Sequence, residues 1–199
     1  MVNAHQLSRE IREPGSQASL SDDPPAFMVF PVTAARRAVR IYHRSGAKAA
    51  LSYLNNSKVG DWTDSPNPSL ASNARNTIAG LELYIAEDIA DKRPLRELDR
   101  KTVISLSSGP VEVRLDAVLD DIDGVAGRVV LWDGPDFAEK DAAAIAAVFG
   151  EALEKAFPGE TATSIAIWQV RRGHTIEIPV TRAKRHLNRA AKVRSSLPS

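Results

Sequence analysis

Hydrophobic positions between residues 69 and 180 change their spacing several times, and each change predicts a different element. Apolar side chains at steps of three and four predict a long helix over residues 69–92: Ala74, Ile78, Leu81, Ile85 and Ile89. Alternation of Val111, Val113 and Leu115 with polar residues predicts a strand. A second long helix is expected over residues 137–157, where alanines dominate and Pro158 and Gly159 follow.

The predicted elements follow one another as helix, three strands, helix and two strands. The expected strands are 102–107, 111–119 and 128–132 as a three-strand meander, followed by 162–170 and 174–180. A helix that crosses from the third strand to the fourth allows these two strands to be parallel. The sequence therefore predicts an α/β or α+β fold, with a mixed sheet of four to five strands and flanking helices.

The chain divides into four segments by composition. Residues 1–25 are polar and are expected to form a flexible arm, whereas residues 26–68 form a basic helical segment and loop. Residues 69–180 form the core, and residues 181–199 form a basic tail or helix. Within the second segment "FMVFPV" is either a short strand or a docking segment, Thr33 caps a helix to about Arg44, and "AKAALSYLNN" is a second short helix.

Composition indicates a cytoplasmic globular protein. Hydrophobic residues make up 43% of the 199 residues and charged residues 26%. The sequence contains no apolar run of roughly 20 residues, the length that crosses a bilayer, so we expect no membrane association. It contains no cysteine, and its four histidines lack the spacing of metal ligands.

The net charge of +1 conceals an uneven distribution. Residues 61–180 contain 21 acids and 12 bases, a net charge of −9, whereas residues 26–60 and 181–199 each contain six bases and no acid. Candidate nucleic-acid contacts are the bases of these two segments: Arg36, Arg37, Arg40, Arg44, Arg182, Arg185, Arg189 and Lys192. The same cations also suit solvent, the acidic core of this chain, or an acidic protein partner.

Two acids end neighbouring apolar runs. Asp116 closes "VEVRLD", and Asp133 closes "RVVLWD" immediately before Gly134 and Pro135. Carboxylates from adjacent strands are a common way to hold a divalent metal. Judged singly, Asp133 caps a turn and Asp116 pairs with Arg114, so only their joint placement indicates a metal site.

These acids and the predicted order of elements resemble the PD-(D/E)XK nuclease superfamily, particularly its RecB-type and lambda-exonuclease-like branches. The resemblance implies a restriction-endonuclease-like core, in which the second strand of the meander delivers an Asp and the third ends in (D/E)-x-Lys. It places Asp116 and Asp133 at the two acid positions, where they would hold Mg²⁺. Glu82 on the preceding helix is a candidate third carboxylate.

The chain departs from the family at the catalytic lysine. Gly134 and Pro135 occupy the positions of the variable residue and the lysine, and proline has no charge to stabilise phosphate. The resemblance therefore implies a catalytically degenerate member that binds nucleic acid or assembles with protein in a nucleic-acid-processing or defence complex, with Mg²⁺ as a cofactor only if the chain is active. Two alternatives stay open: an active Mg²⁺-dependent nuclease in which Lys140 replaces the lysine, and a pure protein-interaction domain.

Overall fold

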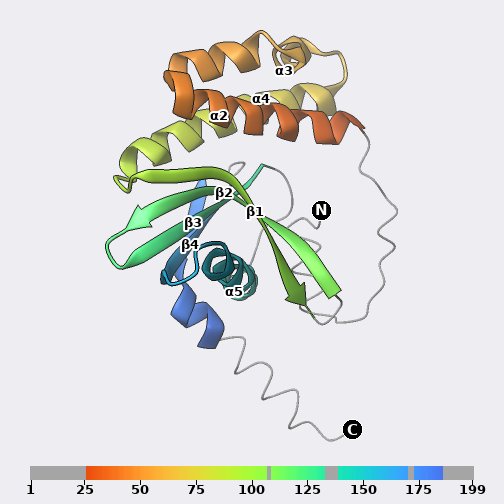
Figure 1. Ribbon diagram of the computed structural model, residues 1–199. Coiled ribbons are helices and arrows are strands. Elements are labelled where there is room, and N and C mark those ends of the chain that lie inside the picture. Colours follow the sequence, from red (N-terminus) through yellow and green to blue (C-terminus); the bar gives the residue numbers. More distant parts are fainter. Residues whose placement is uncertain (1–25, 107–108, 133–138, 170–172, 186–199) are drawn as a thin grey trace, which may run out of the picture.

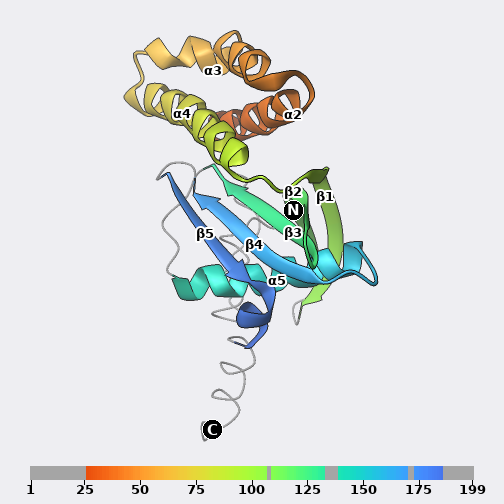
Figure 2. The same cartoon turned by 90° about the vertical axis from the view of Figure 1, so that its left-hand side faces the viewer.

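The fold is known from a computed structural model that describes residues 26–106, 109–132, 139–169 and 173–185. A group of helices lies on one side of a mixed sheet and a single long helix lies on the other side (Figures 1 and 2). The helical group contains α2 (Ala26–Asn55), α3 (Lys58–Asp61), the 3-10 turn η1 (Trp62–Asp64) and α4 (Pro68–Ala90). The sheet contains β1 (Leu95–Leu106), β2 (Gly109–Asp121), β3 (Gly124–Leu131), β4 (Ala162–Gln169) and β5 (His174–Pro179), and the single helix is α5 (Glu139–Ala156).

The five strands follow their sequence order across the sheet. Strands β1, β2 and β3 form an antiparallel meander, β4 is parallel to β3, and β5 returns antiparallel to β4. Helix α5 makes the connection between the two parallel strands, as a parallel pair requires. The predicted mixed sheet, its meander and its flanking helices are confirmed.

The sheet separates two hydrophobic cores because neighbouring residues of its central strands face opposite sides. In β3, Val129 packs in the core under α5, whereas Val130 packs against the helical group. In β4, Ile167 likewise packs in the core under α5, and Trp168 packs against the helical group. The central strand β3 is therefore covered on both faces, which explains why its sequence is almost continuously apolar.

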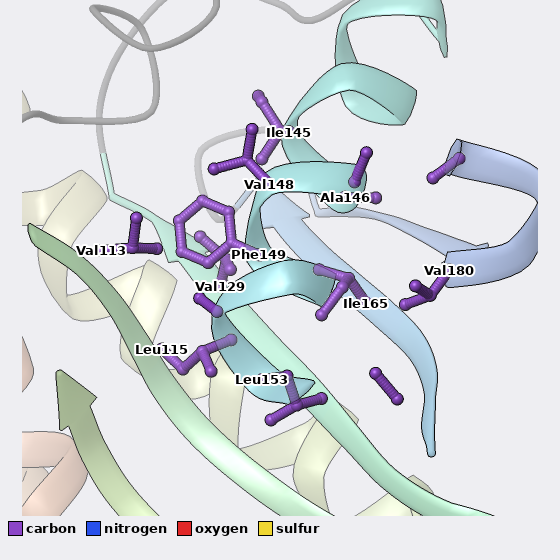
Figure 3. Packing of buried hydrophobic residues seen from close by; sticks show 14 of the residues in the cluster. Val113, Leu115, Val129, Ile145, Ala146, Val148, Phe149, Leu153, Ile165 and Val180 are labelled. Carbon is purple, nitrogen blue, oxygen red and sulfur yellow. The ribbon is translucent and has the colours of Figure 1, made fainter. Parts of the chain in front are cut away.

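The core under α5 is built from small helix residues and branched strand residues. Figure 3 shows Phe149 and Leu153 of α5 lying over Leu115, Val129 and Ile165 of the sheet. Gly127 of β3 leaves room for the side chains of the two neighbouring strands, because a Cβ there would lie 2.7 Å from Cδ2 of Leu115 and 2.8 Å from Cδ1 of Ile165. The buried alanines of α5 belong to the same core.

Several predicted boundaries in the first half of the chain are wrong. The run "FMVFPV" is part of α2 and is neither a strand nor a separate docking segment, and Thr33 lies inside that helix and does not begin it. A short apolar run has no period that distinguishes a strand from a helix, which explains the error. The predicted division of this region into two helices corresponds to a kink at Gly46, whose φ of 82° is not helical.

Two strands begin earlier than the sequence suggested. Strand β1 starts at Leu95 and β3 starts at Gly124, because both extend along β2 through polar or small residues that carry no alternating pattern. Residues 180–185 form a helical turn where a basic helix was expected. The predicted arm at residues 1–25 and the rest of the tail lie outside the described residues. Within the described part of the chain, no helix has the length and apolarity to span a membrane.

Ile165→Ala tests the core under α5. Ile165 is fully buried, so its truncation should lower the free energy of unfolding by about 2–5 kcal/mol. The matched control is Ile122→Ala, because Ile122 is 99% exposed at the β2–β3 turn and its truncation should change stability by less than about 0.5 kcal/mol. Urea denaturation of both variants measures the difference, and equal losses would contradict this packing.

Candidate functional site

Asp116 lies inside β2 at the point where β2 and β3 part. The described pairing of these strands runs from Asp121 opposite Gly124 to Ala117 opposite Arg128 and stops there. The next free N–H of β3 is satisfied by a side chain, since Val130 donates to Oδ2 of Asp116 at 2.8 Å. Asp116 therefore takes the place of a missing backbone acceptor. Asp116 closes an apolar run but does not end its strand, because β2 continues along β3 to Asp121.

The environment of Asp116 disfavours a free, ionised carboxylate. Burial raises its pKa, and the positive charge of Arg36 together with the Val130 N–H opposes that rise only in part. Nε of Arg36, from α2, lies 3.5 Å from Oδ1 of Asp116. Both oxygens of this carboxylate therefore face internal partners.

A second acid, Asp99 of β1, lies across from Asp116. Its neighbours Leu98 and Arg100 pair with Ala117 and Leu115, which places Asp99 opposite Asp116. The carboxylate of Asp99 accepts hydrogen bonds from Arg40 of α2 and Arg114 of β2. The two acids are thus each held by arginines at the contact between α2 and the sheet.

A small pocket lies between these charged groups, with room for about one water molecule. Its lining combines ion-paired, apolar and indole side chains: Arg36, Val39, Arg40, Leu98, Asp99, Asp116, Val130 and Trp132. Nε of Arg36 and Nε1 of Trp132 are buried and have no hydrogen-bond partner among the described residues. We call Arg36, Arg40, Arg114, Asp99 and Asp116 the α2–sheet charge cluster.

The structure describes only some of the predicted metal ligands and catalytic residues. Asp133 lies outside the described residues, and so does the side chain of Lys140, whose backbone belongs to the first turn of α5. Glu82 is exposed on α4, whereas Asp116 is buried in β2. Among the residues that the structure describes, no three acidic or histidine side chains are grouped to hold a metal ion.

The predicted nucleic-acid contacts separate into two kinds. Arg36 and Arg40 turn toward the sheet and its acids. Arg37 is exposed and its guanidinium lies 5.4 Å from the ring centre of Tyr53, and Arg44 is also exposed. In the tail, Arg182 and Arg185 are exposed on the turn at residues 180–185, whereas Arg189 and Lys192 lie outside the described residues.

Sequence reasoning missed the most buried charge among the residues that the structure describes. Arg128 of β3 is 0% exposed, and it pairs with Asp88 and, at 2.9 Å, with Asp91 at the end of α4. Its guanidinium lies 3.9 Å from the ring centre of Trp168. A lone arginine beside an apolar run was the available signal, but its partners 37 and 40 residues earlier could not be read from spacing.

Aromatic and histidine side chains surround the Arg128 pair. His43 of α2 lies 2.9 Å from the hydroxyl of Tyr84, which also accepts from Arg128 at 3.4 Å. Burial lowers the pKa of His43, and the charge of Arg128 adds to this, although Asp88 opposes it. Burial and a hydrogen bond with Asp88 raise the pKa of Tyr42 to about 12. These groups therefore stay neutral around one paired cation.

Searches of known protein families and of curated proteins return no match for this chain.

Arg128→Met tests the buried ion pair. The change leaves Asp88 and Asp91 facing an apolar side chain, and loss of one partner from a buried pair typically costs about 3–5 kcal/mol. Arg44→Met is the matched control, because Arg44 is exposed and its replacement should cost less than about 0.5 kcal/mol. Denaturation in urea gives both values. A loss below about 1 kcal/mol for Arg128→Met would show that the pair contributes no more than a surface ion pair.

His43 should make stability fall as the pH is lowered. The unfolded chain protonates this ring near its ordinary pKa of 6.5, whereas the folded chain, with a lower pKa, protonates it later. Acid therefore favours the unfolded state below pH 6.5. His43→Gln should flatten the fall between pH 8 and pH 5, and His174→Gln, at an exposed position, should not. Identical pH profiles for the parent and His43→Gln would contradict the assignment.

Proposed function

We propose that this chain is a nucleic-acid-binding module on a nuclease-like fold that does not cleave the nucleic acid it binds. It would serve in a nucleic-acid-processing or defence complex, where binding or assembly is the contribution of this chain. The observed order of helix, three-strand meander, helix and strand is consistent with the resemblance described above.

The engagement of Asp116 supports a non-catalytic role most directly. A carboxylate that holds Mg²⁺ must be ionised and must direct oxygens at the metal. Here one oxygen accepts the N–H of Val130, the other faces Arg36, and burial raises the pKa. Pro135 stands where the resemblance would require a lysine. Both features oppose the chemistry of phosphodiester hydrolysis.

The outer surface of α2 and α3 supports nucleic-acid binding. Arg44, Lys48 and Lys58 are exposed, and none of them has an ion-pair partner among the described residues. Arg37 is exposed beside the ring of Tyr53. Residues 26–60 contain no acid, and the exposed Asp61 at the end of α3 offsets only one of these cations, so this surface would attract phosphate chains through the release of condensed counterions. The sequence beyond residue 180 adds six further basic residues, of which Lys184 pairs with Glu154 of α5.

Purified protein with Mg²⁺ or Mn²⁺ should not cleave single- or double-stranded DNA above background, because Asp116 is engaged internally and Pro135 stands where a lysine would be required. Gel electrophoresis of labelled substrates over hours measures this. The control is the double variant Asp116→Ala with Asp133→Ala, checked for folding by circular dichroism. Cleavage by the parent that disappears in the folded double variant would establish the active nuclease instead.

The affinity for nucleic acid should fall as the salt concentration rises and should depend on the exposed cations of α2. Fluorescence anisotropy of a labelled oligonucleotide should give an affinity that falls steeply as salt rises. Arg44→Gln with Lys48→Gln should weaken binding and reduce the slope of log affinity against log salt by about 0.7–0.9 for each lost phosphate contact. Lys101→Gln with Lys155→Gln removes the same charge from β1 and α5 and is the matched control.

Two outcomes separate the rival roles. Equal losses in the α2 variant and its control would show only a general effect of charge. Absence of salt-dependent binding by the full chain would reject nucleic-acid binding and leave a protein-interaction role. A deletion of residues 186–199 in the same assay determines how much of the slope belongs to the tail.

A further inference from the structure

The carboxylate of Asp99 occupies a position between two guanidinium groups of different elements. Arg40 reaches it from α2 and Arg114 reaches it from β2. Charge-assisted bonds from arginine suit carboxylate and phosphate oxygens alike, because both present anionic acceptors to a planar donor. A site that holds Asp99 in this way has the donors that a phosphate group requires.

The backbone at Asp99 adopts a left-handed conformation. Its φ is 57°, and it is the one described residue other than glycine with positive φ. Aspartate and asparagine adopt this region more readily than most other side chains, so the conformation suits both residues. The turn of the backbone lies at the point where Arg40 and Arg114 donate to the Asp99 carboxylate.

Solvent reaches this site from the side of Arg40. The side chain of Arg40 is 46% exposed and that of Asp99 is 20% exposed, whereas that of Arg114 is 13% exposed. Nε of Arg36 and Nε of Arg114 are buried without a hydrogen-bond partner among the described residues, so an incoming anion would meet Arg40 first. Arg44 lies one helical turn beyond Arg40, and the exposed cations of α2 therefore continue to the edge of this site.

We infer that the α2–sheet charge cluster is a phosphate site that Asp99 occupies as an internal competitor. A phosphodiester of a bound nucleic acid would displace the Asp99 carboxylate from Arg40 and Arg114 and would take over their hydrogen bonds. The inference rests on the proposed function for the nature of the ligand. Asp99 would then lower the affinity of the α2 surface for nucleic acid until phosphate replaces it.

Asp99→Asn is the sharpest test because asparagine tolerates positive φ and keeps the shape of the side chain. The neutral amide should compete poorly for the arginines, so oligonucleotide affinity at low salt should rise at least about threefold. The salt slope should steepen by about 0.7–0.9, the value for one further phosphate contact. Glu112→Gln is the matched control, because it removes one acid from β2 that pairs only with Lys101 among the described residues.

A second substitution identifies the donor. Arg40→Gln combined with Asp99→Asn should abolish the gain, since the freed guanidinium is the group that binds phosphate. Equal gains from Asp99→Asn and Glu112→Gln would overturn the inference, because they would reflect net charge alone. Persistence of the gain in the double variant would overturn it too.

Inorganic phosphate separates this inference from the proposed function. Phosphate should raise the melting temperature of Asp99→Asn more than that of the parent or of Asp99→Asn with Arg40→Gln. If this occurs while no variant binds oligonucleotides, the phosphate site stands and the nucleic-acid role fails. If oligonucleotides bind the parent and Asp99→Asn equally and phosphate stabilises neither, the nucleic-acid role stands and the phosphate site is overturned. Failure of both probes in Asp99→Asn rejects both.

Discussion

The arrangement of this protein depends on charge pairing across the contact between its helical group and its sheet. The sheet supplies Arg128 to the acids of α4, and in the opposite direction α2 supplies Arg36 and Arg40 to the acids of β2 and β1. Arg128 is fully buried, and a buried ion that loses its partner costs several kcal/mol, so this pair holds the helical group and the sheet in one specific register. Hydrophobic packing forms the two cores, and these reciprocal pairs fix how the cores are joined.

The same pairing limits what the site can do chemically. An acid that completes a strand ladder and faces an arginine cannot also serve a metal without a rearrangement of the strands. The exposed cations on the outer side of α2 have no acid to pair with among the described residues, so they can contact an anionic partner. Asp99 lies between these two groups of cations, because it pairs with Arg40, which is one helical turn from the exposed Arg44. This distribution of charge is the basis of the proposal that the chain binds nucleic acid without cleaving it.

Periodicity predicted the elements whose stability comes from one apolar face. Helix α4, the meander and the α5 crossover carry clear periods, and the sequence placed them correctly apart from their ends. It missed the early start of α2 and of β1, where tertiary pairing overrides a weak local pattern. Asp116 was found as a polar residue after an apolar run, but its hydrogen bond to Val130 depends on where two strands diverge. Arg128 was missed because its partners are distant in sequence, and no local rule names them.

The central claim is that Asp116 is committed to the protein interior and does not hold a divalent metal. Titration of the full chain with Mn²⁺, followed by electron paramagnetic resonance of the free ion, measures this without any assumption about substrate. The account predicts no stoichiometric Mn²⁺ site, and it predicts the same titration curve for the parent and for Asp116→Asn. One Mn²⁺ bound per chain by the parent, and lost in a folded Asp116→Asn variant, would contradict it.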